Sequence, residues 1–183
     1  MLGLLDVHQA LLAQEVHHEI VHLSRSVSEA DDIPAALGLE STRCGVVRVY
    51  TSDDGPVAAL LRAGEWPDDR NLVRGLRLAG HSAAGLRPAS RDEAVSATDY
   101  QAGLVSPLGL PGHVTTLADA KLAAVPVVYV PTGDSGTALG IRTEDLLALT
   151  GARVTWLTLP TGRDRNTAER VIVLPRTAAT VSR

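Results

Sequence analysis

The chain contains no phenylalanine and only five aromatic residues among its 183 amino acids. Its hydrophobic core must therefore be filled by Leu, Val, Ile and Ala. With 45% apolar and 21% charged residues, the composition is close to that of an average globular protein. These values exclude a disordered chain, a collagen-like fibre and a highly charged tail protein. The length predicts one domain, or one domain with a tail.

The sequence shows no signal for export, membrane insertion or disulfide bonding. No apolar run approaches the roughly 18 residues that a membrane-spanning helix needs, and the N-terminus lacks a basic region and carries Asp6. The single cysteine, Cys44, excludes a disulfide framework and a cysteine-based zinc site, and we interpret it as core filler. We therefore expect a cytoplasmic protein. Because the net charge is −4, contact with a nucleic acid would need a local basic face.

Short periodic segments alternate along the chain. Apolar spacing and capping residues predict helices over 1–16, 28–37, 67–80, 90–97 and 143–149. Runs of β-branched residues predict strands over 45–51, 57–62, 114–117, 125–130, 137–141 and 153–159, with 171–174 as a further candidate. The first two strands flank a turn and form a predicted hairpin, whereas 19–23 is compatible with either a helix or a strand. This mixture predicts an α/β, or mixed α+β, single domain.

The segment from His18 to His22 matches the H-E-x-x-H zinc signature. On a helix, the two imidazoles would share one face and bind Zn²⁺, with Glu19 as general base. A third ligand would also be needed, and only Glu29 and Glu40 follow nearby. On a strand, the two histidines would lie too far apart to share an ion without another donor. A zinc-dependent hydrolase through His18, Glu19 and His22 therefore remains one alternative.

The segment from Gly103 to Pro107 forms a predicted loop with the pattern G-x-x-x-P. Such a loop exposes backbone N–H groups beside a residue without a Cβ atom. These donors can hold a carbonyl oxygen and stabilise the oxyanion that forms when an ester is attacked. An ordinary turn-rich connection between two elements is the alternative interpretation of the same residues.

The loop lies within a longer pattern, Tyr-x-x-Gly-x-x-Ser-Pro-x-Gly, inside Thr98–Leu110. In this pattern, and in the order of the predicted elements around it, the chain resembles the YbaK/EbsC family of prolyl-tRNA-synthetase-associated editing domains. The resemblance covers about residues 17–158. It divides the chain into an N-terminal helix (1–16), an editing domain (17–159) and a C-terminal extension (160–183).

The resemblance implies a fold and an activity. The implied fold is a curved, barrel-like mixed β-sheet flanked by helices. The implied activity is deacylation in trans, in which water cleaves the ester between a mischarged amino acid and the 3′-terminal ribose of tRNA. Backbone amides of the loop and a ribose hydroxyl of the substrate assist the attack, and neither a metal nor another cofactor takes part.

The resemblance also assigns residues. Gly103 and its neighbouring amides would hold the acyl carbonyl, with Ser106 and Pro107 as the rest of the catalytic loop. The family usually has a lysine where Val46 stands here, so Arg48, on the same face of the predicted strand, would supply the missing cation. An arginine can bind a phosphate but cannot act as a base. The residues expected to contact the substrate are Arg43, Val46, Gly133, Gly136 and Ala138.

The implied partners are the 3′ acceptor end of a mischarged tRNA and an aminoacyl-tRNA synthetase, with no membrane involved. Because the lysine is missing and Ala138 stands where the family often has a polar residue, a second alternative is a tRNA-binding module with weak or no catalysis. The sequence does not predict the oligomeric state or the amino acid that is edited.

Overall fold

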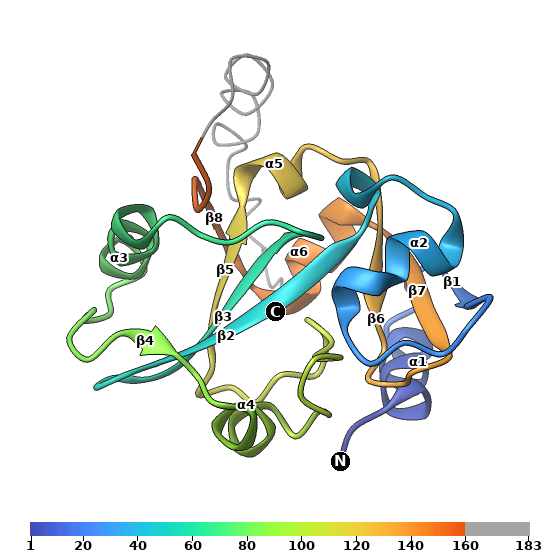
Figure 1. Cartoon of the computed structure of the whole chain (residues 1–183), viewed down its shortest axis with the longest axis horizontal. Coiled ribbons are helices and arrows are strands. Elements are labelled where there is room, and N and C mark those ends of the chain that lie inside the picture. Colours follow the sequence, from blue (N-terminus) through green and yellow to red (C-terminus); the bar gives the residue numbers. More distant parts are fainter. Residues whose placement is uncertain (160–183) are drawn as a thin grey trace, which may run out of the picture.

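Two β-sheets organise the chain, which a computed structural model describes over residues 1–159 (Figure 1). The larger sheet has the strand order β4-β2-β3-β5-β8. Its strands are β2 (Gly45–Ser52), β3 (Gly55–Arg62), β4 (Arg87–Pro88), β5 (Thr115–Asp119) and β8 (Arg153–Thr155). The predicted hairpin is confirmed, since β2 and β3 pair antiparallel, and β5 then joins β3 in parallel.

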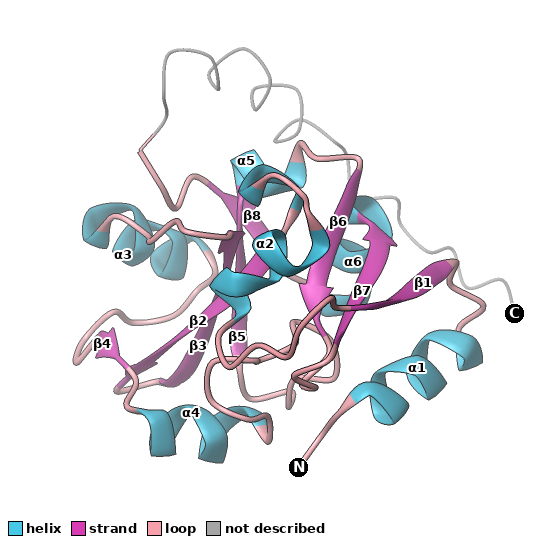
Figure 2. Ribbon diagram, turned by 45° about the vertical axis from the view of Figure 1, so that its right-hand side comes forward, coloured by secondary structure: helices cyan, strands magenta, loops and turns pink. Residues whose placement is uncertain are grey.

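The smaller sheet is antiparallel, with the order β1-β7-β6. It consists of β1 (His18–His22), β6 (Val127–Pro131) and β7 (Thr137–Arg142). Figure 2 shows it beside the larger sheet. An isolated bridge between Cys44 and Tyr129 links the two. A Cβ atom at Gly45 would lie 3.1 Å from Val130 Cγ1, so the small residue lets the start of β2 approach β6 closely.

Mixed α/β architecture is confirmed, but one curved, barrel-like sheet is not what the structure contains. The strands divide between two sheets, and residues 1–159 form no closed barrel. Strand β1 pairs only with β7, and among residues 1–159 the Cys44–Tyr129 bridge is the single backbone pairing between the two sheets, although their side chains pack together in the core.

Helices close the remaining faces. They are α1 (Leu4–Ala13), α2 (Ile33–Leu37), α3 (Asp69–Leu78), α4 (Arg91–Thr98), α5 (Ala120–Ala123) and α6 (Thr143–Thr150), with 3₁₀ turns η1 (Ala30–Asp32) and η2 (Ser41–Arg43). The capping box from Ser90 to Glu93 is confirmed, and Gly38 and Gly151 end their helices in the left-handed conformation. Within residues 1–159, no helix is long and apolar enough to cross a bilayer.

Several predicted boundaries were wrong. The helix predicted from residue 28 begins as the 3₁₀ turn η1, and the strand predicted over 153–159 ends at Thr155. The four-residue helix α5 was missed because it is too short to show periodicity. The ambiguous segment 19–23 belongs to strand β1. The strand predicted over 171–174 lies outside the described residues.

Strand β3 runs through the middle of the core. Its side chains belong to two apolar clusters. Leu61 is in the first cluster, together with Leu72 and Leu76 of α3. Leu60 is in the second cluster, which contains Leu11 of α1 and also Tyr100. Because both faces of β3 are covered, its side chains are almost continuously apolar. Aliphatic residues fill both clusters, as the absence of phenylalanine requires.

The thiol of Cys44 is completely buried in the first of these clusters. Burial disfavours the thiolate and raises the pKa of Cys44 to about 11. We therefore expect no reaction of the folded protein with a thiol reagent at pH 8, and one reactive thiol per chain after unfolding in urea. Rapid labelling of the folded protein, monitored by mass spectrometry, would contradict the assignment of Cys44 as core filler.

Candidate active site

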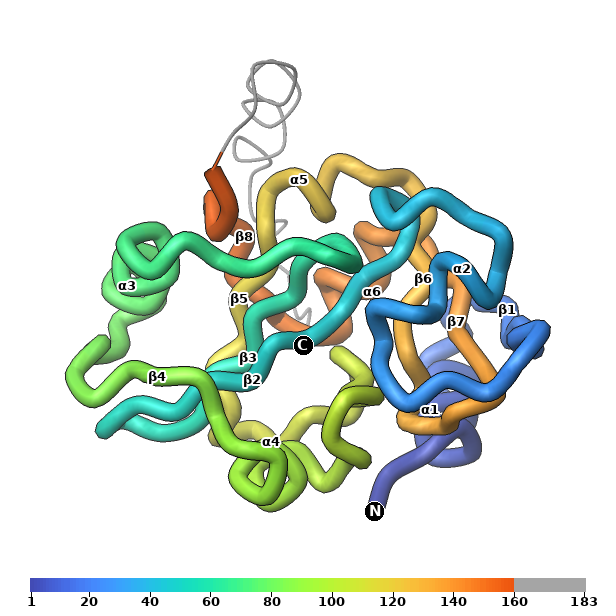
Figure 3. The backbone as a smooth tube through the Cα atoms, viewed as in Figure 1, coloured from blue at the N-terminus to red at the C-terminus, as the bar shows by residue number. Residues whose placement is uncertain are grey.

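A hollow of about 240 Å³ lies beside β2, where several connections of the larger sheet meet. It is lined by residues of β2, the β3–α3 connection, the N-terminus of α4 and the loop that follows α4. In Figure 3, this loop is the yellow-green chain that turns back on itself before entering β5. The lining residues that matter for chemistry are Glu29, Arg48, Trp66, Arg91, Gly103 and Val105.

The G-x-x-x-P loop leaves backbone donors unused. Gly103 has a φ of +90°, and its carbonyl accepts a 2.8 Å hydrogen bond from the Ala30 amide. The amide of Leu104 is used in a turn, donating to Gln101 O at 3.0 Å. The amides of Gly103, Val105 and Ser106 donate to no acceptor among residues 1–159. Of these residues, Gly103 and Val105 line the hollow.

Ser106 and Pro107 have a different position from Gly103. Both are buried, and neither lines the hollow. The Ser106 hydroxyl accepts a hydrogen bond from the Leu108 amide at 3.3 Å, and the Tyr100 hydroxyl donates to Leu108 O at 2.7 Å. Burial raises the pKa of Tyr100 to about 12, so its hydroxyl stays protonated as a donor. These contacts hold the shape of the loop on its buried side.

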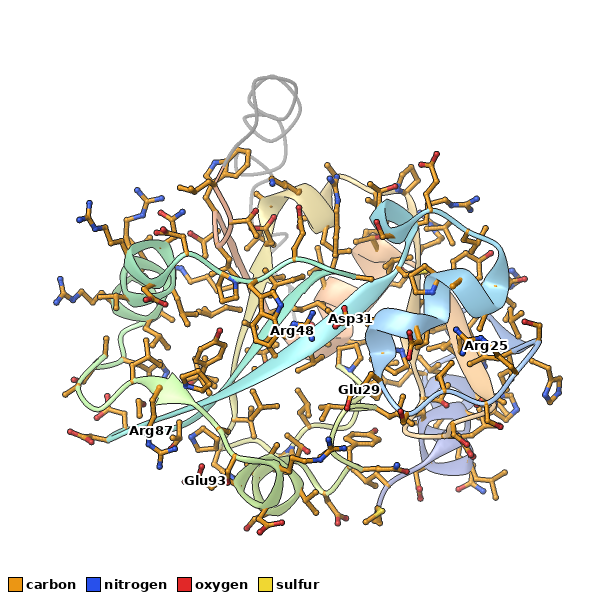
Figure 4. All side chains as sticks on the ribbon, viewed as in Figure 1. Arg25, Glu29, Asp31, Arg48, Arg87 and Glu93 are labelled. Atoms are coloured by element: carbon orange, nitrogen blue, oxygen red, sulfur yellow. The ribbon has the colours of Figure 1, made fainter. Side chains whose placement is uncertain are left out.

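Arg48 is the cation that the fold brings to the hollow. Its guanidinium donates to both carboxylate oxygens of Asp31 at 2.8 Å and to Glu65 O at 3.3 Å. It also lies over the Trp66 ring, 4.1 Å from the ring centroid. Figure 4 shows Arg48 and Asp31 side by side in front of β2. The Arg48 side chain is only 12% exposed, so these contacts hold it in one position.

A second ion pair, between Arg91 and Glu29, also lines the hollow. Arg91 donates to Glu29 Oε1 at 3.3 Å and to Ala102 O at 3.4 Å. Glu29 lies against Gly103, where a Cβ atom would be 2.6 Å from Glu29 Oε2. The loop therefore packs on Glu29 only because residue 103 has no side chain.

The N-terminus of α4, which carries Arg91, is itself fixed. Arg87 donates two hydrogen bonds to the Glu93 carboxylate, at 2.9 and 2.7 Å, and the Ser90 amide donates a third at 2.8 Å. These donors, Arg87 first, hold the pKa of Glu93 at about 2. Figure 4 shows Arg87 and Glu93 close together beside α4.

The other residues predicted to contact substrate lie elsewhere. Val46 and Ala138 are buried in the apolar cluster that also contains Leu104. Gly133 packs against the Tyr100 ring, and Gly136 O accepts a hydrogen bond from the amide of Leu23.

Arg43 lines a separate hollow of about 320 Å³ with His18 and Tyr129, and its guanidinium is 5.7 Å from the Tyr129 ring centroid. The structure therefore brings Arg48, but not Arg43, to Gly103.

The H-E-x-x-H segment does not have the helical geometry of a zinc site. It forms β1, so the backbone positions of His18 and His22 are about 13 Å apart. His18 Nε2 instead lies 2.9 Å from Nδ1 of His8 on α1. Across residues 1–159, no three His, Cys, Asp or Glu side chains are grouped so that they could hold a metal ion.

Three residues of the hollow, Glu29, Trp66 and Arg91, were not predicted as residues of an editing site, although Glu29 was considered as a third zinc ligand. Trp66 carried a signal, since it is an aromatic residue next to a proline in a chain with few rings. The only lysine, Lys121, is ion-paired with Glu65 at 3.2 Å and does not line the hollow.

The sequence model of the aminoacyl-tRNA editing domain family matches residues 25–149. The chain belongs to this family. The region that matches includes Arg48, the G-x-x-x-P loop and both ion pairs of the hollow.

Curated relatives include proline–tRNA ligases from three strains of Streptococcus thermophilus, each 31% identical over 115 residues. The alignment spans 62% of this chain but only 18% of each ligase.

Among solved structures, one described as a candidate trans-editing enzyme for prolyl tRNA synthetase is 25% identical, with a TM-score of 0.69 over 85% of this chain and 96% of the other. A hypothetical protein, APE2540, shares the fold at 21% identity, with a TM-score of 0.70 over 81% of this chain and 95% of the other.

Replacing Gly103 by alanine tests the packing of the loop. The left-handed φ and the contacts with Glu29 and with Ser28 O, each 2.6 Å from the new Cβ, should together cost about 2 to 4 kcal/mol of unfolding free energy. Gly112→Ala is the matched control, because no atom lies within 4 Å of its Cβ position. Urea unfolding measures both; equal stability of the two variants would contradict the observed packing.

Replacing Asp31 by alanine tests the ion pair. Asp31 accepts from Arg48 and, at 2.8 Å, from the Gly64 amide, so we expect a loss of about 1 to 3 kcal/mol in unfolding free energy. Asp32→Ala should change stability by less than about 0.5 kcal/mol, because the exposed Asp32 side chain makes no capping hydrogen bond. Thermal or urea unfolding distinguishes the two; a neutral Asp31 variant would show that the pair does not hold the β3–α3 connection.

Proposed function

We propose that the chain is an aminoacyl-tRNA deacylase that hydrolyses the ester of mischarged tRNA in trans. The observation that carries this proposal is one hollow lined by Gly103 and Val105, whose amides donate to no acceptor among residues 1–159, and by Arg48 and Arg91. Membership of the aminoacyl-tRNA editing domain family supplies the substrate class.

The loop amides supply the electrostatic part of the reaction. The acyl carbonyl oxygen would accept hydrogen bonds from them, and the same donors would stabilise the negative charge that develops when water adds to the carbonyl carbon. Collapse of this intermediate breaks the ester bond; the ribose oxygen leaves and gains a proton, and the free amino acid and tRNA are released. A neighbouring ribose hydroxyl of the substrate assists the attack, and the proposal includes no metal.

Arg48 positions the substrate and does not transfer a proton. An arginine side chain does not give up its proton in proteins, so Arg48 can bind a phosphate or a ribose oxygen but cannot act as a base. Ser106 and Pro107 hold the loop. Val46 and Ala138 belong to the apolar cluster that contains Leu104 of the loop, and Gly133 packs against the Tyr100 ring. Arg43, which has no carboxylate partner among residues 1–159, is available to an RNA phosphate farther from the ester.

A second candidate function is tRNA binding without turnover. The observation that favours it is the absence of a lysine from the hollow: Val46 stands at the expected position, and Lys121 is paired with Glu65. In this case the hollow would retain its cations and its amides but would not accelerate hydrolysis.

Incubation of the purified chain with a panel of mischarged tRNAs tests both candidates. The first substrates to test are proline-specific tRNAs that carry a wrong amino acid, because the curated relatives are proline–tRNA ligases. We expect release of the amino acid above the buffer rate for at least one substrate, and a loss of at least about tenfold in kcat/KM for Arg48→Ala. Arg74→Ala, an exposed arginine on α3, is the matched control and should retain full activity.

The outcomes separate the two candidates. Salt-sensitive binding of tRNA without ester cleavage would replace the deacylase by the binding module. Neither binding nor cleavage would overturn both. Equal activity of the Arg48 and Arg74 variants would remove Arg48 from the site while leaving the deacylase in place.

A further inference from the structure

Trp66 is the most exposed aromatic side chain at the hollow, with 61% of its surface accessible. Single exposed apolar residues are common on protein surfaces. This one is unusual because Arg48, itself only 12% exposed, lies over the ring at 4.1 Å from the centroid. One region of the indole is thereby covered by a guanidinium, and most of the rest is open to a ligand.

The connection that carries Trp66 is held on both sides. Before the ring, the Gly64 amide donates to Asp31 at 2.8 Å, and Glu65 pairs with the buried Lys121. After it, the Asp68 amide donates to Leu157 O at 2.8 Å. A ring whose backbone is already fixed loses little conformational entropy when a flat ligand stacks on it.

The polar groups beside the Trp66 ring indicate which kind of ligand would fit there. The Arg48 and Arg91 guanidiniums, each also paired with a carboxylate (Asp31 and Glu29), offer N–H donors to a phosphate or ribose oxygen. The unpaired amides of Gly103 and Val105 favour a carbonyl oxygen. A flat, open indole beside them favours a nucleobase, because bases stack on aromatic side chains with little regard to sequence. A nucleotide acylated on its ribose carries all three groups within one small molecule.

We infer that Trp66 is the stacking platform for the terminal adenine of the tRNA, which orients the attached ester toward the Gly103 and Val105 amides. This inference rests on the proposed function, because it assigns a base subsite within the same hollow. In the bound state the adenine covers the open region of the indole, and Arg48 lies between the ring and the terminal phosphate.

The chain offers a direct optical test, since Trp66 and Trp156 are its only tryptophans. In a Trp156→Phe background, the fluorescence of Trp66 alone is recorded while the trinucleotide CCA, or an acceptor-stem minihelix ending in CCA, is added. We expect saturable quenching by both probes. A minihelix that ends in CC and lacks the adenine should bind about tenfold more weakly and quench little.

Variants of the ring give the second readout. Trp66→Leu should weaken binding of the CCA minihelix about tenfold, whereas Trp66→Phe should restore most of the affinity because it keeps a stacking face. Leu78→Ala, which removes another exposed large apolar side chain outside the hollow, is the matched control and should bind normally. Urea unfolding of each variant checks that the chain is folded.

The failure of this inference differs from the failure of the deacylase proposal. Quenching by CCA without ester cleavage would retain the base subsite and remove the enzyme activity. Ester cleavage with no quenching, and with a Trp66→Leu variant that binds as tightly as the parent, would overturn the inference and leave the deacylase intact. Equal quenching by the CC and CCA minihelices would also overturn it, because the ring would then not contact the terminal adenine.

Discussion

The contact between Arg48 and Asp31 is the interaction on which the site depends. It joins three segments that are separate in the sequence: the 3₁₀ turn η1, strand β2 and the connection from β3 to α3. The same guanidinium also lies over Trp66 and donates to Glu65 O. Because a planar guanidinium can make these contacts at once, one side chain sets both the position of the ring and the charge beside the loop.

The parts of the fold that depend on local sequence could be predicted. The Ser90–Glu93 capping box, the β2–β3 hairpin and the glycine helix ends each follow from a few neighbouring residues, and all are confirmed. The loop from Gly103 to Pro107 was also found, because glycine and proline mark turns through their own backbone preferences.

The parts that depend on distant contacts could not be predicted in the same way. The separation into two sheets is decided by the pairing of β1 with β7 over more than a hundred residues. Glu29 meets Gly103, and Arg91 meets Glu29, only in the folded chain. Strand alternation placed Arg48 on the face of Val46, yet nothing local indicated that Asp31 and Trp66 would hold it there.

In the proposed deacylase, Arg48 would take the role of the family's lysine, and this changes what the protein would have to supply for catalysis. A lysine can lose its proton when it is buried, whereas Arg48 keeps its charge and is held by Asp31 and Trp66. Under this proposal, the proton that the reaction moves would be carried by water and by the substrate's own hydroxyl, while the protein would supply geometry and fixed dipoles. With a net charge of −4, the chain does not attract RNA through its overall field. Recognition of the proposed tRNA substrate would therefore act at short range, through the guanidiniums, the open indole and the loop amides within one small hollow. In the proposed complex, selectivity would come from simultaneous contacts with base, phosphate and ester, because a competitor that lacks one of these groups would lose the corresponding contact.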